Sequence, residues 1–242
     1  MIIESVRRAL LSNALIIVSL LPCPRIDASE IQPIPDCWVW GGVPLDRAEI
    51  CGRTLYVHQG WVGEDRRGVF VRAQGLSPHE IRDRDLVLVY RLTSLPPVER
   101  WMPAATERAA HWVRRGSRVV GIQLDFDSAT ARLGEYARWL RLVRTALPTR
   151  YRLSVTGLAD WSTQGDPLSL TRISKVVDEV VFQLYRGRSP IPLESAYLNG
   201  LARLDIPFKL GLLPGMDLGG SDYKRVRANP SFRGSVVFLQ KE

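Results

Sequence analysis

The sequence has few of the residues that form metal or redox centres. Its 242 residues include three histidines and three cysteines. No CxxC, His-x-x-His or mixed Cys/His cluster is present, so we expect no zinc site. No Gly-rich GxGxxG follows the first apolar run, which argues against a dinucleotide-binding fold. We therefore expect no cofactor.

Long basic runs are also missing. The formal net charge is +8, but it is carried by arginines scattered singly or in pairs. This pattern lacks the clustered basic and aromatic residues that follow a phosphate backbone, so we expect no nucleic-acid partner. The charge instead predicts solubility, with some attraction to anionic polymers.

No uninterrupted apolar run is long enough for a clear membrane span. The stretch from Ala9 to Leu21 is broken by Ser and Asn, follows an arginine pair and precedes Ile-Asp-Ala, which ends at Ala28. This arrangement favours a secretory signal over residues 1–28, and export to the periplasm or extracellular space. An N-terminal membrane tether is the alternative. We expect residues 29–242 to form a single domain, and the protein to be a monomer.

Two cysteines, Cys37 and Cys51, remain after such a signal is removed. An even pair in an exported protein is compatible with a disulfide, which would stabilise the fold by about 3 kcal/mol through loop entropy. Two free buried thiols are the alternative, because the spacing of the Cα atoms decides between them.

Short apolar runs alternate with amphipathic stretches along the rest of the chain. Helical patterns cover residues 98–116, 128–148, 168–177 and 192–204. Predicted strands begin at Cys37, Thr54, Asp85, Val119, Tyr151, Glu179, Phe208 and Ser235. Such alternation is typical of parallel sheets, and eight strands favour an α/β fold of the (β/α)8 TIM-barrel type, compact and lacking the last outer helix. An open doubly wound sheet is the alternative.

Two carboxylates stand at the end of the fourth predicted strand, in GIQLDFDSAT. Side chains alternate along a strand, so Gln123, Asp125 and Asp127 share one face. Two carboxylates this close in a semi-buried cleft are expected to drive one pKa upward. An acid beside a carboxylate is the arrangement that glycosidic cleavage needs.

Structural roles compete with this interpretation. Asp127 or, preferably, Ser128 would serve as the N-cap of the helix that follows. Asp125 would form an ion pair with Arg91 or Arg186 at the mouth of the barrel.

Other polar and aromatic residues stand at or near the predicted strand ends, where barrel enzymes carry their functional groups. The tryptophans suit stacking on sugar rings, with core packing as the alternative for each. His58 is a further cleft candidate, whereas His79 and His111 are expected to have no role. An anion clamp formed by Arg91, Arg186 and Arg188 is a third possibility. The candidate substrate-binding residues are Trp38, Trp40, Gln59, Trp61, Gln123, Asp160, Trp161, Gln183, Tyr185 and Arg186.

Three blocks of sequence, GIQLDFD, SVTGL and QLYRG, resemble the family known as domain of unknown function 3142, found in exported bacterial proteins. The resemblance covers most of the chain after the leader and implies a barrel related to glycoside hydrolases. More distantly, the fourth and sixth predicted strands are similar to those of family-18 glycoside hydrolases, the chitinases and their relatives. This similarity implies that Asp127 is the proton donor, that Asp125 orients the substrate, and that Gln183 and Tyr185 bind it.

The chain also departs from the family-18 pattern. Val120 and Gln123 replace two acids, Asp127 replaces a longer Glu, and Arg186 stands where the relatives carry Asp or Asn. The leading hypothesis is an exported glycoside hydrolase-like barrel that acts on a polysaccharide or glycan. The alternative is a catalytically inactive glycan-binding barrel.

Overall fold

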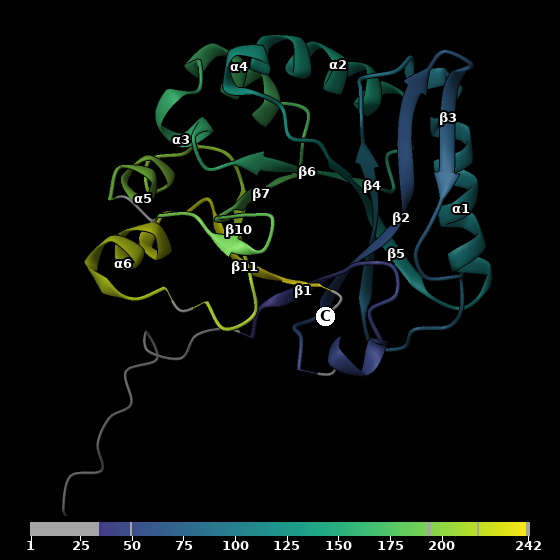
Figure 1. Ribbon diagram of the computed structural model, residues 1–242, viewed down its shortest axis with the longest axis horizontal. Helices are drawn as coiled ribbons and strands as arrows, with labels where there is room; N and C mark the ends of the chain where they lie inside the picture. Colours follow the sequence, from purple (N-terminus) through teal and green to yellow (C-terminus); the bar gives the residue numbers. More distant parts are fainter. Residues whose placement is uncertain (1–33, 49, 193–194, 217, 241–242) are drawn as a thin grey trace, which may run out of the picture. The chain divides into compact units, whose positions relative to one another are not determined.

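A computed structural model of the chain describes residues 34–48, 50–192, 195–216 and 218–240. The expected signal, residues 1–28, lies outside these residues. Eight parallel strands form a closed ring, because β1 pairs with both β2 and β11 (Figure 1). The ring consists of β1 (Asp36–Val39), β2 (Thr54–Asp65), β4 (Asp85–Leu92), β5 (Arg118–Asp125), β6 (Arg152–Leu158), β7 (Glu179–Gln183), β10 (Phe208–Leu212) and β11 (Phe232–Leu239). The predicted (β/α)8 barrel is confirmed, and the open sheet is wrong.

Helices cover the outside of the ring (Figure 1). Those matching the four predicted patterns are α1 (Met102–Arg114), α2 (Leu133–Ala146), α4 (Pro167–Ser174) and α5 (Ser195–Leu201). Two helices, α3 (Trp161–Gln164) and α6 (Gly220–Ala228), have no counterpart among the predicted patterns. The 3-10 turns are η1 (Leu45–Ala48), η2 (Val98–Arg100) and η3 (Thr130–Arg132). No helix follows β11 within the described part of the chain.

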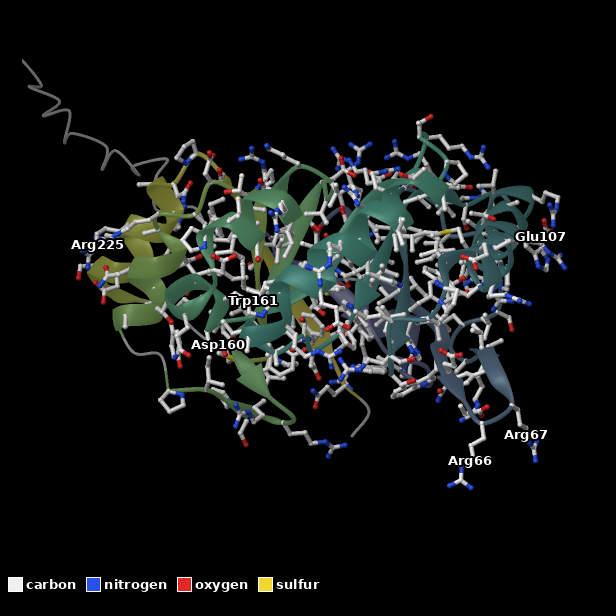
Figure 2. The ribbon with its side chains drawn as sticks, turned by 90° about the horizontal axis from the view of Figure 1, so that it is seen from above. Arg66, Arg67, Glu107, Asp160, Trp161 and Arg225 are labelled. Atoms are coloured by element: carbon white, nitrogen blue, oxygen red, sulfur yellow. A yellow bond between two sulfur atoms is a disulfide. The ribbon has the colours of Figure 1, made fainter. Side chains whose placement is uncertain are left out.

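Two hairpins extend the barrel beyond the predicted elements. Strand β3 (Gly68–Ala73) pairs antiparallel with the far half of β2, and this hairpin takes the place of a helix between β2 and β4. Figure 2 shows Arg66 and Arg67 projecting from its tip. A second, smaller hairpin of β8 (Tyr185–Arg186) and β9 (Ser189–Pro190) follows β7.

The alternation of side chains along the strands divides the core into two layers. One face packs inside the ring, where Trp38 stacks on Phe238 with ring centroids 5.3 Å apart. The other face packs against the helices, where Trp112 of α1 and Tyr136 of α2 are fully buried. Side chains on both faces of each strand are therefore apolar, which explains the near-continuous hydrophobic runs in the sequence.

Cys37 and Cys51 form a disulfide. Cys37 in β1 is bonded to Cys51, just before β2, with Cα atoms 5.6 Å apart. This settles the choice that the sequence left open. No helix in the described ranges has both the length and the apolarity needed to cross a membrane.

Candidate functional site

The two aspartates of GIQLDFD meet one arginine at the carboxyl end of the barrel. Asp125 is the last residue of β5 and lies beside Arg91 of β4 in the strand register. Arg91 Nη1 donates to Asp125 Oδ1 at 2.9 Å and to Asp127 Oδ1 at 3.2 Å, and Arg91 Nη2 contacts Asp127 Oδ2. The two carboxylates therefore lie on the same side of the strand end, as alternation predicts.

Burial separates the two carboxylates. The Asp125 side chain is 2% exposed, whereas that of Asp127 is 46% exposed. Asp125 Oδ1 also accepts hydrogen bonds from Thr156 Oγ1 at 2.9 Å and Gln183 Nε2 at 3.4 Å. Burial raises the pKa of Asp125 above its ordinary value, although Arg91 and Thr156 oppose the rise. The sequence predicts one raised pKa, and desolvation, more than the second carboxylate, is its cause.

Of the two structural roles considered for these aspartates, the ion pair is present and the helix cap is absent. Asp125 does form the ion pair with Arg91 that was considered for it. Capping by Asp127 or Ser128 is wrong, because η3 begins after Ala129 without a side-chain cap, and α2 follows Arg132 without one.

Two adjoining cavities open at this end of the barrel. The first has a volume of about 810 Å³ and the second of about 520 Å³. Asp127, Gln183, Tyr185 and Gly187 line both of them. A ligand that fills both cavities therefore passes over the Asp127 carboxylate.

Four further candidates from the sequence line one of these cavities. Asp160 and Arg186 border the first, and Trp40 and Trp61 border the second. Asp160 accepts a hydrogen bond from Thr130 Oγ1 at 2.7 Å. Among the described tryptophans, Trp40 and Trp61 border the second cavity. Their indole rings are placed to stack on a ligand there.

Two candidates are sealed inside the barrel below the mouth. The Trp38 side chain is fully buried, and its Nε1 donates to Gln123 Oε1 at 2.7 Å. Gln123 Nε2 in turn donates to Ser154 Oγ at 2.9 Å. Both polar groups are thus satisfied within the core, which corrects the prediction that Trp38 and Gln123 bind the substrate.

Two other candidates lie buried in the layer between the strands and the helices. Trp161 is 1% exposed, donates through Nε1 to Ser128 O at 3.0 Å, and lies in α3 next to Asp160 (Figure 2). Gln59 is 2% exposed, and its Oε1 accepts from Arg108 Nε at 2.8 Å and Trp112 Nε1 at 2.7 Å. These contacts hold the outer layer together, so the substrate-binding prediction is wrong for both residues.

His58 lies beneath the second cavity among tryptophans. Its ring centroid is 4.8 Å from that of Trp40, 5.8 Å from that of Trp38 and 6.2 Å from that of Trp61. Burial lowers the pKa of His58 to about 4, and the charge of Arg91 adds to this effect. His58 is therefore a neutral packing residue and does not border either cavity.

Two residues that shape the site were not predicted from the sequence. Thr156 supports Asp125 from β6, and Tyr197 of α5 lines the first cavity. Thr156 has a signal, since the alternation of SVTGL places it on the same face as Ser154. Tyr197 has none, because only the topology brings its helix to the cavity. No cluster of His, Cys, Asp or Glu able to hold a metal occurs in the residues whose structure is described.

The fold defines a (β/α)8 barrel with two cavities at its carboxyl end. A crystal structure of a tamarind chitinase-like lectin is 10% identical with a TM-score of 0.50, over 84% of this chain and 94% of that chain. This likeness shows the fold.

The expected family resemblance is also confirmed. Residues 83–192, which include all three blocks noted in the sequence, match the domain of unknown function (DUF3142). No curated protein matches the chain.

Two further solved structures are similar at lower TM-scores. The spore cortex-lytic enzyme SleL of Bacillus cereus is 15% identical with a TM-score of 0.44, over 78% of this chain and 54% of that chain. The chitinase domain of the spore coat protein CotE from Clostridium difficile is 14% identical with a TM-score of 0.45, over 85% and 73%.

Proposed function

We propose that the protein is a glycoside hydrolase that cleaves a polysaccharide or glycan, with Asp127 as the general acid. The observation that carries this proposal is the position of Asp127, at the junction of two cavities that together hold more than one sugar ring. A glycan lying across both places a glycosidic bond next to an exposed carboxyl group, as acid catalysis requires.

The surrounding residues supply the remaining functions. Trp40 and Trp61 offer aromatic faces to sugar rings in the second cavity. Gln183 and Tyr185 line both cavities and are placed to contact the ring at the cleavage point. Buried Asp125 holds Arg91 in place and orients the site from below.

The contact between Arg91 and Asp127 is the obstacle in this mechanism. In the unliganded protein Arg91 Nη2 contacts Asp127 Oδ2, so the carboxyl group is engaged by a cation and is not free to face a glycosidic oxygen. The proposal therefore requires that bound substrate weaken the contact between Arg91 and Asp127.

The test is hydrolysis of a panel of bacterial polysaccharides by the unaltered protein and by Asp127→Asn. We expect this substitution to lower the rate by roughly 100-fold or more, the usual contribution of a general acid. Asp83→Asn is the matched control, because Asp83 is exposed and its backbone φ of 58° suits Asn equally well. Equal rates for the unaltered protein and Asp127→Asn refute the acid assignment.

A second function, glycan binding without cleavage, is favoured by one specific observation. Arg91 contacts both carboxylates and so engages the pair in ionic contacts in the absence of ligand. Under this proposal, glycan-array binding is lost in Trp40→Ala and Trp61→Ala but persists unchanged in Asp127→Asn, and no polysaccharide is cleaved.

We further propose that the protein is exported and monomeric. The Cys37–Cys51 disulfide supports export, since such bonds persist in oxidising compartments. Cell fractionation with and without residues 1–28 tests this proposal, and retention in the membrane fraction indicates a tether instead. Light scattering of the purified protein tests whether it is a monomer in solution.

A further inference from the structure

The fold gathers arginines at the end of the barrel opposite the candidate active site. Arg152 opens β6, Arg150 precedes that strand by two residues, and Arg233 is the second residue of β11. All barrel strands are parallel, so their amino ends lie together. A cavity of about 590 Å³ opens there, and all three arginines line it.

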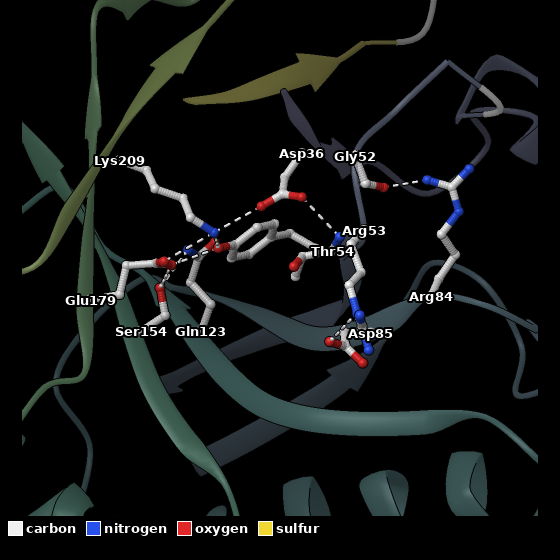
Figure 3. A network of polar contacts seen from close by, with 11 residues as sticks. Asp36, Gly52, Arg53, Thr54, Arg84, Asp85, Gln123, Ser154, Glu179 and Lys209 are labelled. Carbon is white, nitrogen blue, oxygen red and sulfur yellow. Dashed lines mark hydrogen bonds and ion pairs between the residues drawn. The ribbon is translucent and has the colours of Figure 1, made fainter. Parts of the chain in front are cut away.

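A closed polar network forms the buried side of this cavity (Figure 3). Lys209 Nζ contacts Asp36 Oδ2 at 2.8 Å and Glu179 Oε2 at 3.1 Å. Glu179 Oε1 accepts from Tyr56 OH at 2.6 Å and from Ser154 Oγ at 3.1 Å. Glu179 is therefore tied into the network, although it shares the single charge of Lys209 with Asp36.

The other two acids that line the cavity also have partners. Asp85 pairs with Arg53 at 3.3 Å and with Arg118 (the Arg53 contact is drawn in Figure 3). Asp178 pairs with Arg144 at 3.2 Å and accepts from the backbone N–H of Leu153 at 2.7 Å. None of these acids forms an ion pair with the three arginines in the described residues. Counting the three arginines, cations exceed acids around the cavity by three: Lys209, Arg53, Arg118, Arg144, Arg150, Arg152 and Arg233 against Asp36, Asp85, Asp178 and Glu179.

The three arginines have no acidic partner among the residues that the structure describes. The Arg150 guanidinium lies over the Tyr151 ring, 4.7 Å from its centroid. Arg233 Nη1 donates to the backbone carbonyl of Phe232 at 3.2 Å and to that of Pro230. All three side chains are exposed, so their free N–H groups are accessible to a ligand from solvent.

We propose that this amino-terminal cavity binds a phosphate group, with Arg150, Arg152 and Arg233 as its cationic ligands. Guanidinium groups match the oxygens of phosphate with paired N–H donors, and a phosphate monoester carries enough charge to balance nearly two of them. The ligand is either free phosphate or the phosphate of a lipid headgroup. The proposal does not depend on the proposed function, because no residue of the two carboxyl-end cavities takes part.

Isothermal titration of the full chain with inorganic phosphate at low ionic strength tests the proposal. We expect Arg152→Gln to weaken binding roughly tenfold, and the triple substitution of all three arginines by Gln to abolish it. The matched control replaces Arg66, Arg67 and Arg100 by Gln, which removes the same charge from exposed positions elsewhere. Binding that is unchanged in the first triple variant, or equally weakened in both, overturns the proposal.

A second measurement on the unaltered protein guards against misfolding of the variants. Phenylglyoxal modifies accessible arginines, and mass spectrometry locates the modified sites. Phosphate is expected to protect Arg150, Arg152 and Arg233 but not Arg66, and uniform modification with and without phosphate contradicts the site.

Sedimentation with phosphatidylglycerol vesicles then distinguishes the two sources. Vesicle binding that only the first triple variant loses identifies a lipid headgroup. Phosphate titration without vesicle binding identifies the free ion.

Discussion

Replacing Lys209 by Met is the sharpest test of how the amino-terminal end of the barrel is held together. Lys209 is 12% exposed and contacts the carboxylates of Asp36 and Glu179, each 15% exposed. Burial alone would lower the pKa of Lys209, but Glu179 and Asp36 raise it above its ordinary value. The ammonium group is therefore charged at every pH below its folded pKa, and both carboxylates depend on it.

The cost of the substitution follows from these contacts. At an effective dielectric constant of about 20, unit charges about 4 Å apart attract by roughly 4 kcal/mol, and both contacts here are shorter. Desolvation of the three groups offsets much of this attraction. Removing one partner of a buried pair typically costs about 3 to 5 kcal/mol, because the stranded charge stays buried. We expect Lys209→Met to fall in this range.

Urea unfolding followed by tryptophan fluorescence measures the loss. Lys224→Met is the matched control, since Lys224 is exposed on α6 and should change stability by less than about 0.5 kcal/mol. A loss below about 1 kcal/mol at pH 7 would refute the reasoning.

Three further predictions concern the scaffold. Reduction of the Cys37–Cys51 disulfide should lower stability by about 3 kcal/mol, measured by thermal unfolding with and without a thiol reductant. Burial lowers the pKa of His58 to about 4, so its contribution to the free energy of unfolding should be fully present above about pH 6.5. Between pH 6.5 and 4 the free energy of unfolding should fall by up to about 1.4 kcal/mol per pH unit. His58→Phe should flatten this slope in urea titrations. Gly75→Ala should destabilise by about 2 kcal/mol more than Gly68→Ala, because both glycines have positive φ but only at Gly75 would the added Cβ meet a backbone oxygen, that of His58, at 1.9 Å. Equal unfolding midpoints for these two variants would contradict this account.

The barrel itself was predictable because its signals are local. Each of the eight predicted apolar runs forms a strand whose first residue lies within three residues of the predicted one. The largest difference is in β11, which begins at Phe232 instead of Ser235. The β2–β3 hairpin was missed because its turn, Asp65 to Gly68, lacks the Asn-Gly or Asp-Gly pair that marks tight hairpins. The disulfide was left open because it depends on a distance across the fold.

The candidate site shows a different limit. Alternation correctly placed Gln123, Asp125 and Asp127 on one face, yet their exposure runs from 0% for Gln123 through 2% for the Asp125 side chain to 46% for that of Asp127. Trp38 and Trp40 repeat this pattern, since the first is sealed in the barrel and the second borders a cavity. Two residues along a strand change height by about 7 Å, the difference between core and cleft.

The face of the strand on which a side chain lies therefore follows from the sequence. Its depth in the barrel depends on where the ring of strands ends. The mouth of this barrel lies between Asp125 and Asp127, because the last residue of β5 is still covered by Arg91, Thr156 and Gln183. The buried Asp125 in turn holds Arg91 in place beneath the exposed Asp127. The proposed proton donation by Asp127 therefore requires a ligand that separates Asp127 from Arg91, and a ligand that contacts neither group leaves the pair closed.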